Sequence, residues 1–149
     1  LSLKEENLDA FTQRFLKLAA DEIIPEQMTP QIDIDAVLDL QDINAKFMSE
    51  LKKMNPFGPD NQKPVFCSLG VKDYGTSKLV GKDLEHIKLE LIDDKSNTPI
   101  HGIAFGMHQH NTHIKNMKPF NICYTIEENT YNGNTSLQLM VKDIKENDI

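Results

Sequence analysis

Lysine and aromatic side chains that could contact a chain of phosphates and bases gather in the middle of this sequence. Lysine ammonium groups neutralise phosphates, and a tyrosine ring can stack on an unpaired base for about 1–3 kcal/mol. The candidates for such contacts are Lys72, Tyr74, Lys78, Lys82, His86, Lys88, Tyr131 and Asn132. For each lysine the alternative is an ordinary solvated surface charge, and Tyr131 has the alternative of bracing a hairpin.

The charge of the chain is unevenly spread. The whole sequence carries a net charge of −7. Residues 63–126 nevertheless hold eight basic and six acidic side chains, against six and twelve in residues 1–62 and two and five in residues 127–149. Either this skew is chance, or the middle segment alone meets a polyanion.

Histidines suggest a metal site as a second kind of chemistry. They are His101, His108, His110 and His113. Metal sites in proteins take complete sets of nitrogen, sulfur or oxygen ligands, and no neighbouring cysteine or carboxylate completes such a set here. We therefore expect the histidines to be exposed around a short helix. Asp93 and Asp94 are expected to end a strand in a turn, and no nucleophilic triad or glycine-rich phosphate loop is recognisable.

Cys67 and Cys123 both lie in apolar, strand-like runs. A secreted domain of this size more often carries a fuller set of disulfides, so we expect two buried, reduced thiols in a cytoplasmic protein. The sequence contains no apolar run of the roughly 20 residues that a membrane span needs. We therefore expect no contact with a membrane.

The secondary structure that must position these residues changes from mainly helical to strand-like patterns at residues 55–64, which we call the connector. Before it, a capping box at Ser2 and apolar residues three and four apart predict a helix from Lys4 to Glu22. Period-two alternation predicts a strand over 31–38, and an amphipathic helix is expected over 39–54. The connector itself is rich in proline and glycine, which excludes a continuing helix.

After the connector the chain alternates in the manner of strands. The candidate strands cover residues 65–72, 86–91, 99–105, 120–126 and 137–141, with a short helix over 107–114 before the fourth. In the first strand, Val65, Cys67, Leu69 and Val71 are expected to share one face. Phe66 and Phe105 are predicted to be core or interface residues.

The last two strands can be registered against each other. Asn132-Gly133 favours a two-residue type I′ turn, which places Tyr131 opposite Asn134. Ile126 then lies opposite Leu139 and Tyr124 opposite Val141, and both pairs face the same side. Three strands, a short helix and a hairpin follow the order of an OB-fold, a five-stranded barrel that binds through strands two and three and their flanking loops.

The predicted fold is therefore α+β and mainly β. We expect a helix-strand-helix segment over 1–54, the connector over 55–64 and the OB-fold domain over 65–146. The first segment has too little apolar surface to fold alone, so it is expected to be the tail of a preceding domain.

A series of short motifs resembles the C-terminal half of the RecJ family. The motifs are Ile32-Asp-Ile-Asp-Ala36, Asn55-Pro-Phe-Gly58, Asn61, Pro64-Val-Phe66, Ile103-Ala-Phe-Gly106, Tyr131-Asn-Gly133, Leu137-Gln-Leu139 and Lys142-Asp-Ile144. The resemblance spans nearly the whole chain in the right order. It implies the end of a DHHA1-type domain followed by the OB domain of an exonuclease that degrades single-stranded DNA from the 5′ end in repair and recombination.

The same resemblance implies that the chemistry lies elsewhere in a parent protein. The catalytic core of the family carries Asp-His-His motifs and binds manganese or magnesium, and no His-His pair occurs in this sequence. We therefore expect an inactive, noncatalytic portion without its own cofactor that holds single-stranded DNA. The alternative is an interaction module that docks onto the rest of the parent chain or onto a single-strand-binding protein.

Overall fold

The computed structural model describes residues 2–24, 28–96 and 98–147. The chain divides into two compact units, Leu1–Asp33 and Ile34–Ile149, each described here by itself. Within the described ranges, no helix has the length and apolar character needed to cross a membrane.

The first unit contains one long helix. The 3₁₀ turn η1 (Glu5–Asn7) leads into α1 (Leu8–Glu22). The predicted end of the helix is confirmed, and the helical segment begins at Glu5, next to the predicted Lys4, although its first turn is 3₁₀ and not α-helical. No side-chain hydrogen bond caps either element, so the expected capping box does not form and a 3₁₀ turn takes the place of the first helical turn. The rings of Phe11 and Phe15, one helical turn apart, stack with centroids 5.8 Å apart.

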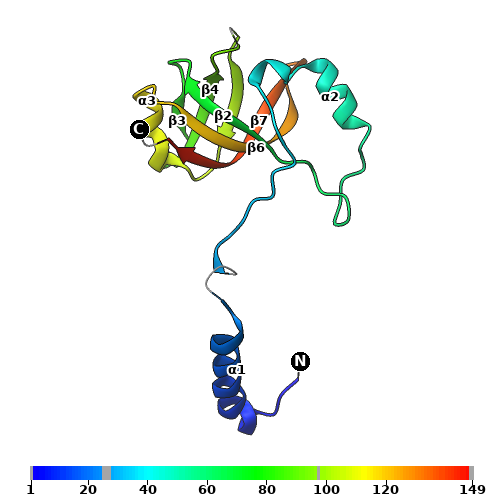
Figure 1. The fold of residues 1–149 in the computed structure, drawn as a ribbon, viewed down its shortest axis with the longest axis vertical. Helices are drawn as coiled ribbons and strands as arrows, with labels where there is room; N and C mark the ends of the chain where they lie inside the picture. Colours follow the sequence, from blue (N-terminus) through cyan, green and yellow to red (C-terminus); the bar gives the residue numbers. More distant parts are fainter. Residues whose placement is uncertain (1, 25–27, 97, 148–149) are drawn as a thin grey trace. The chain divides into compact units, whose positions relative to one another are not determined.

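The second unit is built around a closed sheet (Figure 1). Its elements are β1 (Ala36–Val37), η3 (Leu40–Asp42), α2 (Ala45–Lys52), β2 (Phe66–Asp73), β3 (Lys78–Val80), β4 (His86–Ile92), β5 (Ile100–Ala104), η4 (His108–His110), α3 (Asn111–Lys115), β6 (Phe120–Tyr131) and β7 (Asn134–Glu146). The short strands β1 and β3 lie at the two ends of the strand order, beside β2 and β4.

The other five strands close a barrel with OB-fold connectivity. β2 pairs antiparallel with both β4 and β6, β4 pairs with β5, and β6 pairs with β7. The parallel pair β5–β7 completes the ring. A helix between the third and fourth barrel strands is the arrangement predicted from the sequence, and this prediction is confirmed.

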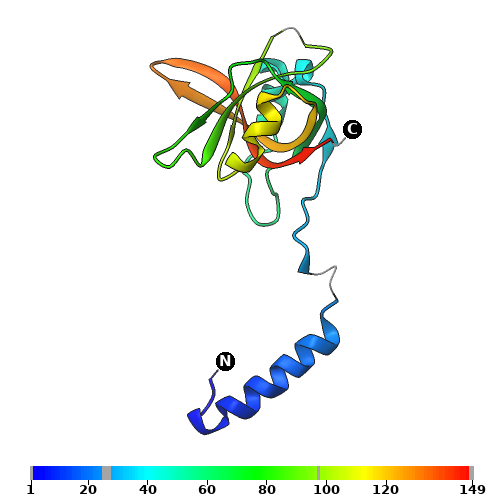
Figure 2. The same cartoon turned by 90° about the vertical axis from the view of Figure 1, so that its left-hand side faces the viewer.

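The interior of the barrel is apolar, and α3 lies across one of its ends (Figure 2). Alternate residues of β4, namely Ile87, Leu89 and Leu91, are fully buried, as their period of two predicts. Ile114 from α3 is also fully buried and joins the same core. The described interior of the barrel is therefore a packed apolar core, which leaves the outer surface as the place to look for a binding site.

The long β6–β7 hairpin has the predicted register. Tyr131 lies opposite Asn134 and Ile126 opposite Leu139, and Tyr124 pairs with Val141. The last four of these residues are buried, and the turn residues Asn132 and Gly133 both have positive φ angles, 49° and 80°. Positive φ at both central positions is the requirement of the type I′ turn, so turn chemistry and hydrophobic pattern agree.

The segment before the connector differs from its prediction. Of the expected strand over 31–38, only β1 pairs, in parallel with β2. The expected helix over 39–54 divides into η3 and α2, because the Asn44 side chain accepts hydrogen bonds from the N–H groups of Lys46 and Phe47 and caps a new helix there. Leu40, Ile43 and Leu51 pack into the barrel core. The domain boundaries at 54 and 64 remain a prediction, although this packing joins 34–54 to the barrel.

A buried hydrogen-bond chain fastens this segment to the barrel. The Ser68 hydroxyl donates to the Leu38 carbonyl at 2.7 Å and lies 2.7 Å from the Tyr124 hydroxyl. Since the serine proton is committed to Leu38, the tyrosine must be the donor to serine. Burial raises the pKa of Tyr124, which keeps its proton available for this bond.

The first barrel strand contains an irregularity that the sequence pattern did not predict. Its register with β6 shifts between Ser68 and Val71. Leu69 is consequently exposed instead of lying on the inner face with Cys67 and Val71, so the prediction for Leu69 is wrong. The buried position of Phe66 is confirmed.

Candidate nucleic-acid interface

The outward-facing side chains of β3, β4 and β5 form one continuous surface, which we call the β3–β5 face. Lys78 on β3 lies directly opposite Lys88 on β4, and Lys88 lies opposite Ile103 on β5. Like charges that face each other across neighbouring strands repel. Among the described residues, no carboxylate lies within ion-pair distance of Lys78, Lys82 or Lys88. We call these three lysines uncompensated, meaning that none of them forms an ion pair with a carboxylate among the described residues.

The loop between β2 and β3 is held against β4 by polar contacts. Buried Asp73 accepts the Ser77 N–H at 3.1 Å, and the Ser77 hydroxyl accepts the Glu90 N–H at 3.0 Å. The Tyr74 N–H donates to the Glu90 carbonyl at 2.8 Å. Thr76 hydrogen-bonds the Glu90 carboxylate. The loop is therefore ordered along the edge of β4, and Tyr74 is presented with half of its surface exposed.

Not every predicted lysine is equally available. Lys72 forms an ion pair with Asp94 at 3.1 Å, so a phosphate would have to displace that carboxylate. Lys82 is exposed in the β3–β4 turn, one residue beyond Gly81. Glu90 is the carboxylate nearest to Lys88 along β4. Its side chain accepts a hydrogen bond from Thr76, and its Oε1 lies 3.5 Å from His101 Nδ1.

An exposed aromatic ring on this face was predicted to be a core or interface residue. Phe105 directly follows β5, and 55% of its surface is exposed, so of the two predicted alternatives the core is excluded and an interface stays a prediction. Its ring packs edge-on against His86, with ring centroids 4.9 Å apart at an interplanar angle of 77°. The Gly106 N–H donates to His86 Nδ1 at 3.1 Å. The structure therefore adds Phe105 to the candidates beside the predicted His86.

The hairpin tip does not join this surface. Gln138 of β7 lies opposite His101 of β5, and Asn132 lies roughly 20 Å further along the hairpin at about 3.4 Å per residue. Asn132 is exposed at the turn, and the side chain of Tyr131 lies outside the described part of the structure. The two predicted hairpin residues are thus separate from the β3–β5 face.

His101 and His108 are exposed as predicted, whereas His110 and His113 make structural contacts. His110 Nδ1 lies 2.8 Å from Glu146 Oε1, and His113 Nδ1 lies 3.2 Å from Glu146 Oε2. His113 also hydrogen-bonds the Pro119 carbonyl through Nε2 at 3.1 Å. The predicted exposure of these two histidines is wrong, since both side chains are largely buried. No three His, Cys, Asp or Glu side chains within the described ranges are arranged to hold a metal ion.

The two cysteines are free thiols on adjacent strands. Cys67 of β2 lies directly opposite Cys123 of β6. Both thiols are free, as predicted, but the predicted burial is confirmed only for Cys67, since Cys123 is partly buried. Burial and the neighbouring Cys67 raise the pKa of Cys123 to about 11, so its thiol is protonated at neutral pH.

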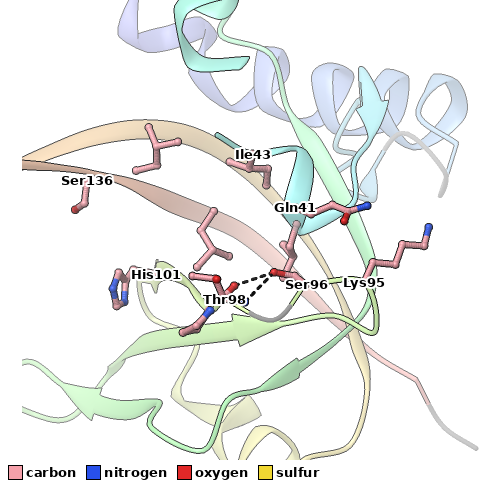
Figure 3. A pocket seen from close by; sticks show the side chains of 11 residues that line it. Gln41, Ile43, Lys95, Ser96, Thr98, His101 and Ser136 are labelled. Carbon is pink, nitrogen blue, oxygen red and sulfur yellow. Dashed lines mark hydrogen bonds between the residues drawn. The ribbon is translucent and has the colours of Figure 1, made fainter. Parts of the chain in front are cut away.

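A hollow of about 510 Å³ lies between η3, the β4–β5 loop and β7 (Figure 3). Its lining includes the apolar side chains of Leu40, Ile43 and Leu137 and the polar side chains of Gln41, Ser96, Thr98 and Ser136. Figure 3 shows His101 and Lys95 on opposite sides of the hollow. Lys95 is held there by Asp39 at 2.7 Å, and this contact raises the pKa of Lys95. The sequence pattern did not indicate this hollow.

Comparison with known proteins identifies related sequences and folds. The family model described as "RecJ OB domain" matches residues 34–143. Curated relatives carry the name single-stranded-DNA-specific exonuclease RecJ. The protein from Haemophilus influenzae is 26% identical over 145 residues, and that from Bacillus subtilis is 25% identical over 144 residues. These matches cover 97% and 96% of this chain but 25% and 18% of the relatives, so the chain spans about a quarter or less of their length.

A solved structure has the same fold. The crystal structure of RecJ in complex with Mn²⁺ from Thermus thermophilus aligns with a TM-score of 0.75 at 17% sequence identity. The alignment covers 100% of this chain and 20% of that chain. A second crystal structure from the same organism, in complex with Mg²⁺, aligns with a TM-score of 0.74. At this level of identity the likeness shows the fold alone, and it agrees with the barrel described above.

Proposed function

The chain belongs to the RecJ OB domain family, and from that premise we propose that its barrel binds single-stranded DNA as the noncatalytic part of an exonuclease. The bound strand lies on the β3–β5 face and is drawn there by Lys78, Lys82 and Lys88. The predicted Tyr74 and His86 flank this path, and the predicted Lys72 is a secondary contact. The predicted Tyr131 and Asn132 lie away from this face, so only a strand that extends along the hairpin would reach them.

One observation carries the proposal. Lys78 and Lys88 face each other across β3 and β4 without a carboxylate partner among the described residues. Two opposed ammonium groups destabilise a sheet, and a phosphate placed between them removes the repulsion. The arrangement is unfavourable for the free protein and favourable for a complex with a polyanion.

Two lysines elsewhere on the same unit differ from Lys78 and Lys88 because each forms an ion pair with a glutamate. Lys52 pairs with Glu128 at 2.7 Å, and Lys63 pairs with Glu127 at 2.7 Å. Both pairs lie beside the connector, on residues that line a different hollow from the one in Figure 3. Within the described residues Lys46, Lys118, Lys142 and Lys145 also form no ion pair, so the absence of carboxylates beside Lys78 and Lys88 supports the proposal through the opposed positions of these two lysines on one face.

We propose that hydrolysis belongs to the parent enzyme and depends on manganese or magnesium outside these residues. The donor sets present here do not fit such an ion, since His110 and His113 are both committed to Glu146. Incubation of the 149-residue chain with Mn²⁺ and a labelled single strand should release no nucleotides. Metal-dependent release would instead make the chain an autonomous hydrolase.

Fluorescence anisotropy with a labelled single-stranded oligonucleotide at low salt tests the binding proposal. We expect saturable binding that weakens as salt is raised, because each phosphate contact releases counterions. Binding no tighter than that of an unrelated protein of the same charge, with no dependence on salt, would refute it.

A second function is supported by an apolar groove on another side of the barrel unit. The groove, of about 290 Å³, is lined by Phe47, Leu51, Met54, Pro64 and Phe66 together with Asp35 and Glu50. Under this alternative the barrel docks onto the rest of the parent chain or a single-strand-binding protein. Replacing Lys78, Lys82 and Lys88 with glutamate separates the two functions, because DNA binding should collapse while docking through the groove should persist.

The predicted organisation around the barrel completes the proposal. The prediction places residues 1–54 at the end of a preceding DHHA1-type domain. Because Leu40, Ile43 and Leu51 pack into the barrel core, we propose that only the residues before Ile34 belong to that domain, and that the parent acts in the cytoplasm. Limited proteolysis of the longer parent protein would test the first point, since cleavage between the two domains should then fall before residue 34 and not within 55–64.

A further inference from the structure

Phe105 is exposed although the barrel beside it is well packed. More than half of its surface is in contact with solvent, whereas Phe66, Phe120 and Tyr124 of the same unit are buried. An exposed phenyl ring forgoes the stabilisation that burial of so large an apolar side chain provides. The ring is therefore a candidate for contact with something other than the core of this unit.

His86 holds one edge of that ring in a fixed position. The imidazole is itself fixed from three sides: its Nδ1 accepts the Gly106 N–H, its Nε2 lies 3.3 Å from Glu85 Oε1, and Gly81 lies against it. A Cβ on Gly81 would come within 3.3 Å of His86 Cδ2, so the absence of a side chain there allows the close approach. Gly106, with a φ of 69°, turns the chain immediately after Phe105.

The ring and the uncompensated lysines belong to the same surface. His86 and Lys88 are two residues apart on β4, and Ile103 and Phe105 are two residues apart along β5 and its end. Side chains two residues apart on a strand share a face, so the phenyl ring and the Lys88 ammonium point to the same side. An aromatic surface beside positive charge complements a nucleotide, which has a flat base and a phosphate. In a duplex the faces of the bases are already stacked, so a base that is free to stack must be unpaired.

The geometry points to a stacking subsite for one unpaired nucleobase, with Phe105 as the contacting ring and His86 as its positioning residue. This inference rests on the proposed function and specifies how the β3–β5 face prefers a single strand to other polyanions. Stacking tolerates any base, so the subsite adds affinity without selecting a sequence.

The test uses two probes on the full chain: a labelled oligothymidylate, and an abasic strand of the same length and phosphate spacing. Phe105→Leu keeps an apolar side chain but removes the ring. We expect it to weaken oligothymidylate binding between about fivefold and a hundredfold, the effect of one lost base stack, and to leave abasic binding and the salt dependence unchanged. His86→Ala should give a smaller loss with the same dependence on bases. The matched control Phe57→Leu, on the connector, should bind both probes as the unchanged chain does.

A second variant provides a direct signal. The chain contains no tryptophan, so Phe105→Trp introduces a single indole whose emission reports on stacking. Oligothymidylate should quench this emission and should bind the variant as tightly as it binds the unchanged chain. The abasic strand should bind without quenching. Unquenched emission with bound oligothymidylate, or equal losses on both probes for Phe105→Leu, would overturn the subsite alone. Failure of the unchanged chain to bind either probe would overturn both the subsite and the proposed function.

Discussion

Replacing Lys78 and Lys88 with glutamine should reduce the salt dependence of DNA binding to about a third of its original slope. Each phosphate contact of a single strand contributes about −0.7 to the slope of log affinity against log salt. Three uncompensated lysines, Lys78, Lys82 and Lys88, therefore predict a slope of about −2 and roughly an 18-fold loss of affinity between 50 and 200 mM salt. With Lys82 alone remaining, the slope falls to about −0.7 and the loss to roughly threefold.

The assay is anisotropy of a labelled oligonucleotide across that salt range, with a control of equal charge change. Lys52→Gln with Lys63→Gln removes two lysines that are already neutralised by Glu128 and Glu127. This control should keep the slope of the unchanged chain. Thermal unfolding of the Lys78 and Lys88 variant should occur at the same or a slightly higher temperature, because a repulsive cross-strand pair has been removed. An unchanged slope in the first variant, or an equal reduction in the control, would refute the assignment.

Three further predictions concern the barrel. Ser68→Ala should lower the free energy of unfolding by about 2–4 kcal/mol, because the Tyr124 hydroxyl and the Leu38 carbonyl both lose their partner. Tyr124→Phe should lower it by about 1 kcal/mol. Urea titrations measure both losses, and equal losses for the two variants would contradict the hydrogen-bond chain. Cys123, with a pKa of about 11, should react with iodoacetamide at pH 8 on the order of a hundredfold more slowly than free cysteine, followed by mass spectrometry. Because its folded pKa exceeds the unfolded value, the free energy of unfolding should fall as the pH rises from about 9 towards 11, and a rise there would oppose the assignment. Gly133→Ala should cost about 1 kcal/mol, because its φ of 80° is left-handed, and unchanged thermal unfolding would argue against a strained turn.

The parts of the fold that local chemistry decides could be predicted from the sequence. Asn132-Gly133 accepts positive φ at both positions, and the alternation around Ile126 and Leu139 permits one register only. The order of strands and the helix before β6 then leave few topologies, and the OB-fold was among them. The family resemblance identified from short motifs is confirmed by the match over 34–143.

Elements that depend on distant partners could not be predicted in the same way. Alternation over 31–38 describes an extended chain equally well, and only Ala36 and Val37 find a partner strand. β3 is three residues long and lies within a loop, so its pattern is too short to show a period. The shift of register after Ser68 that exposes Leu69 comes from the pairing of β2 with β6, which no local pattern contains.

The candidate site shows the same division. Lysines near a predicted strand could be proposed as phosphate contacts, but their carboxylate partners lie far away in sequence: Lys72 meets Asp94 and Lys63 meets Glu127. Which lysines remain uncompensated is therefore a tertiary property. Phe105 was assigned to the core or an interface because apolar character alone does not distinguish a buried ring from one exposed for binding.

Mapping the bound strand onto the protein by NMR tests the central claim most directly. In a titration of the ¹⁵N-labelled chain with oligothymidylate, we expect the largest amide shifts in β3, β4 and at Phe105 and Gly106, with little change in α2 and the connector. Shifts concentrated on α2 and the connector would contradict the account. The absence of shifts at an oligonucleotide concentration at which anisotropy measures binding would contradict it as well.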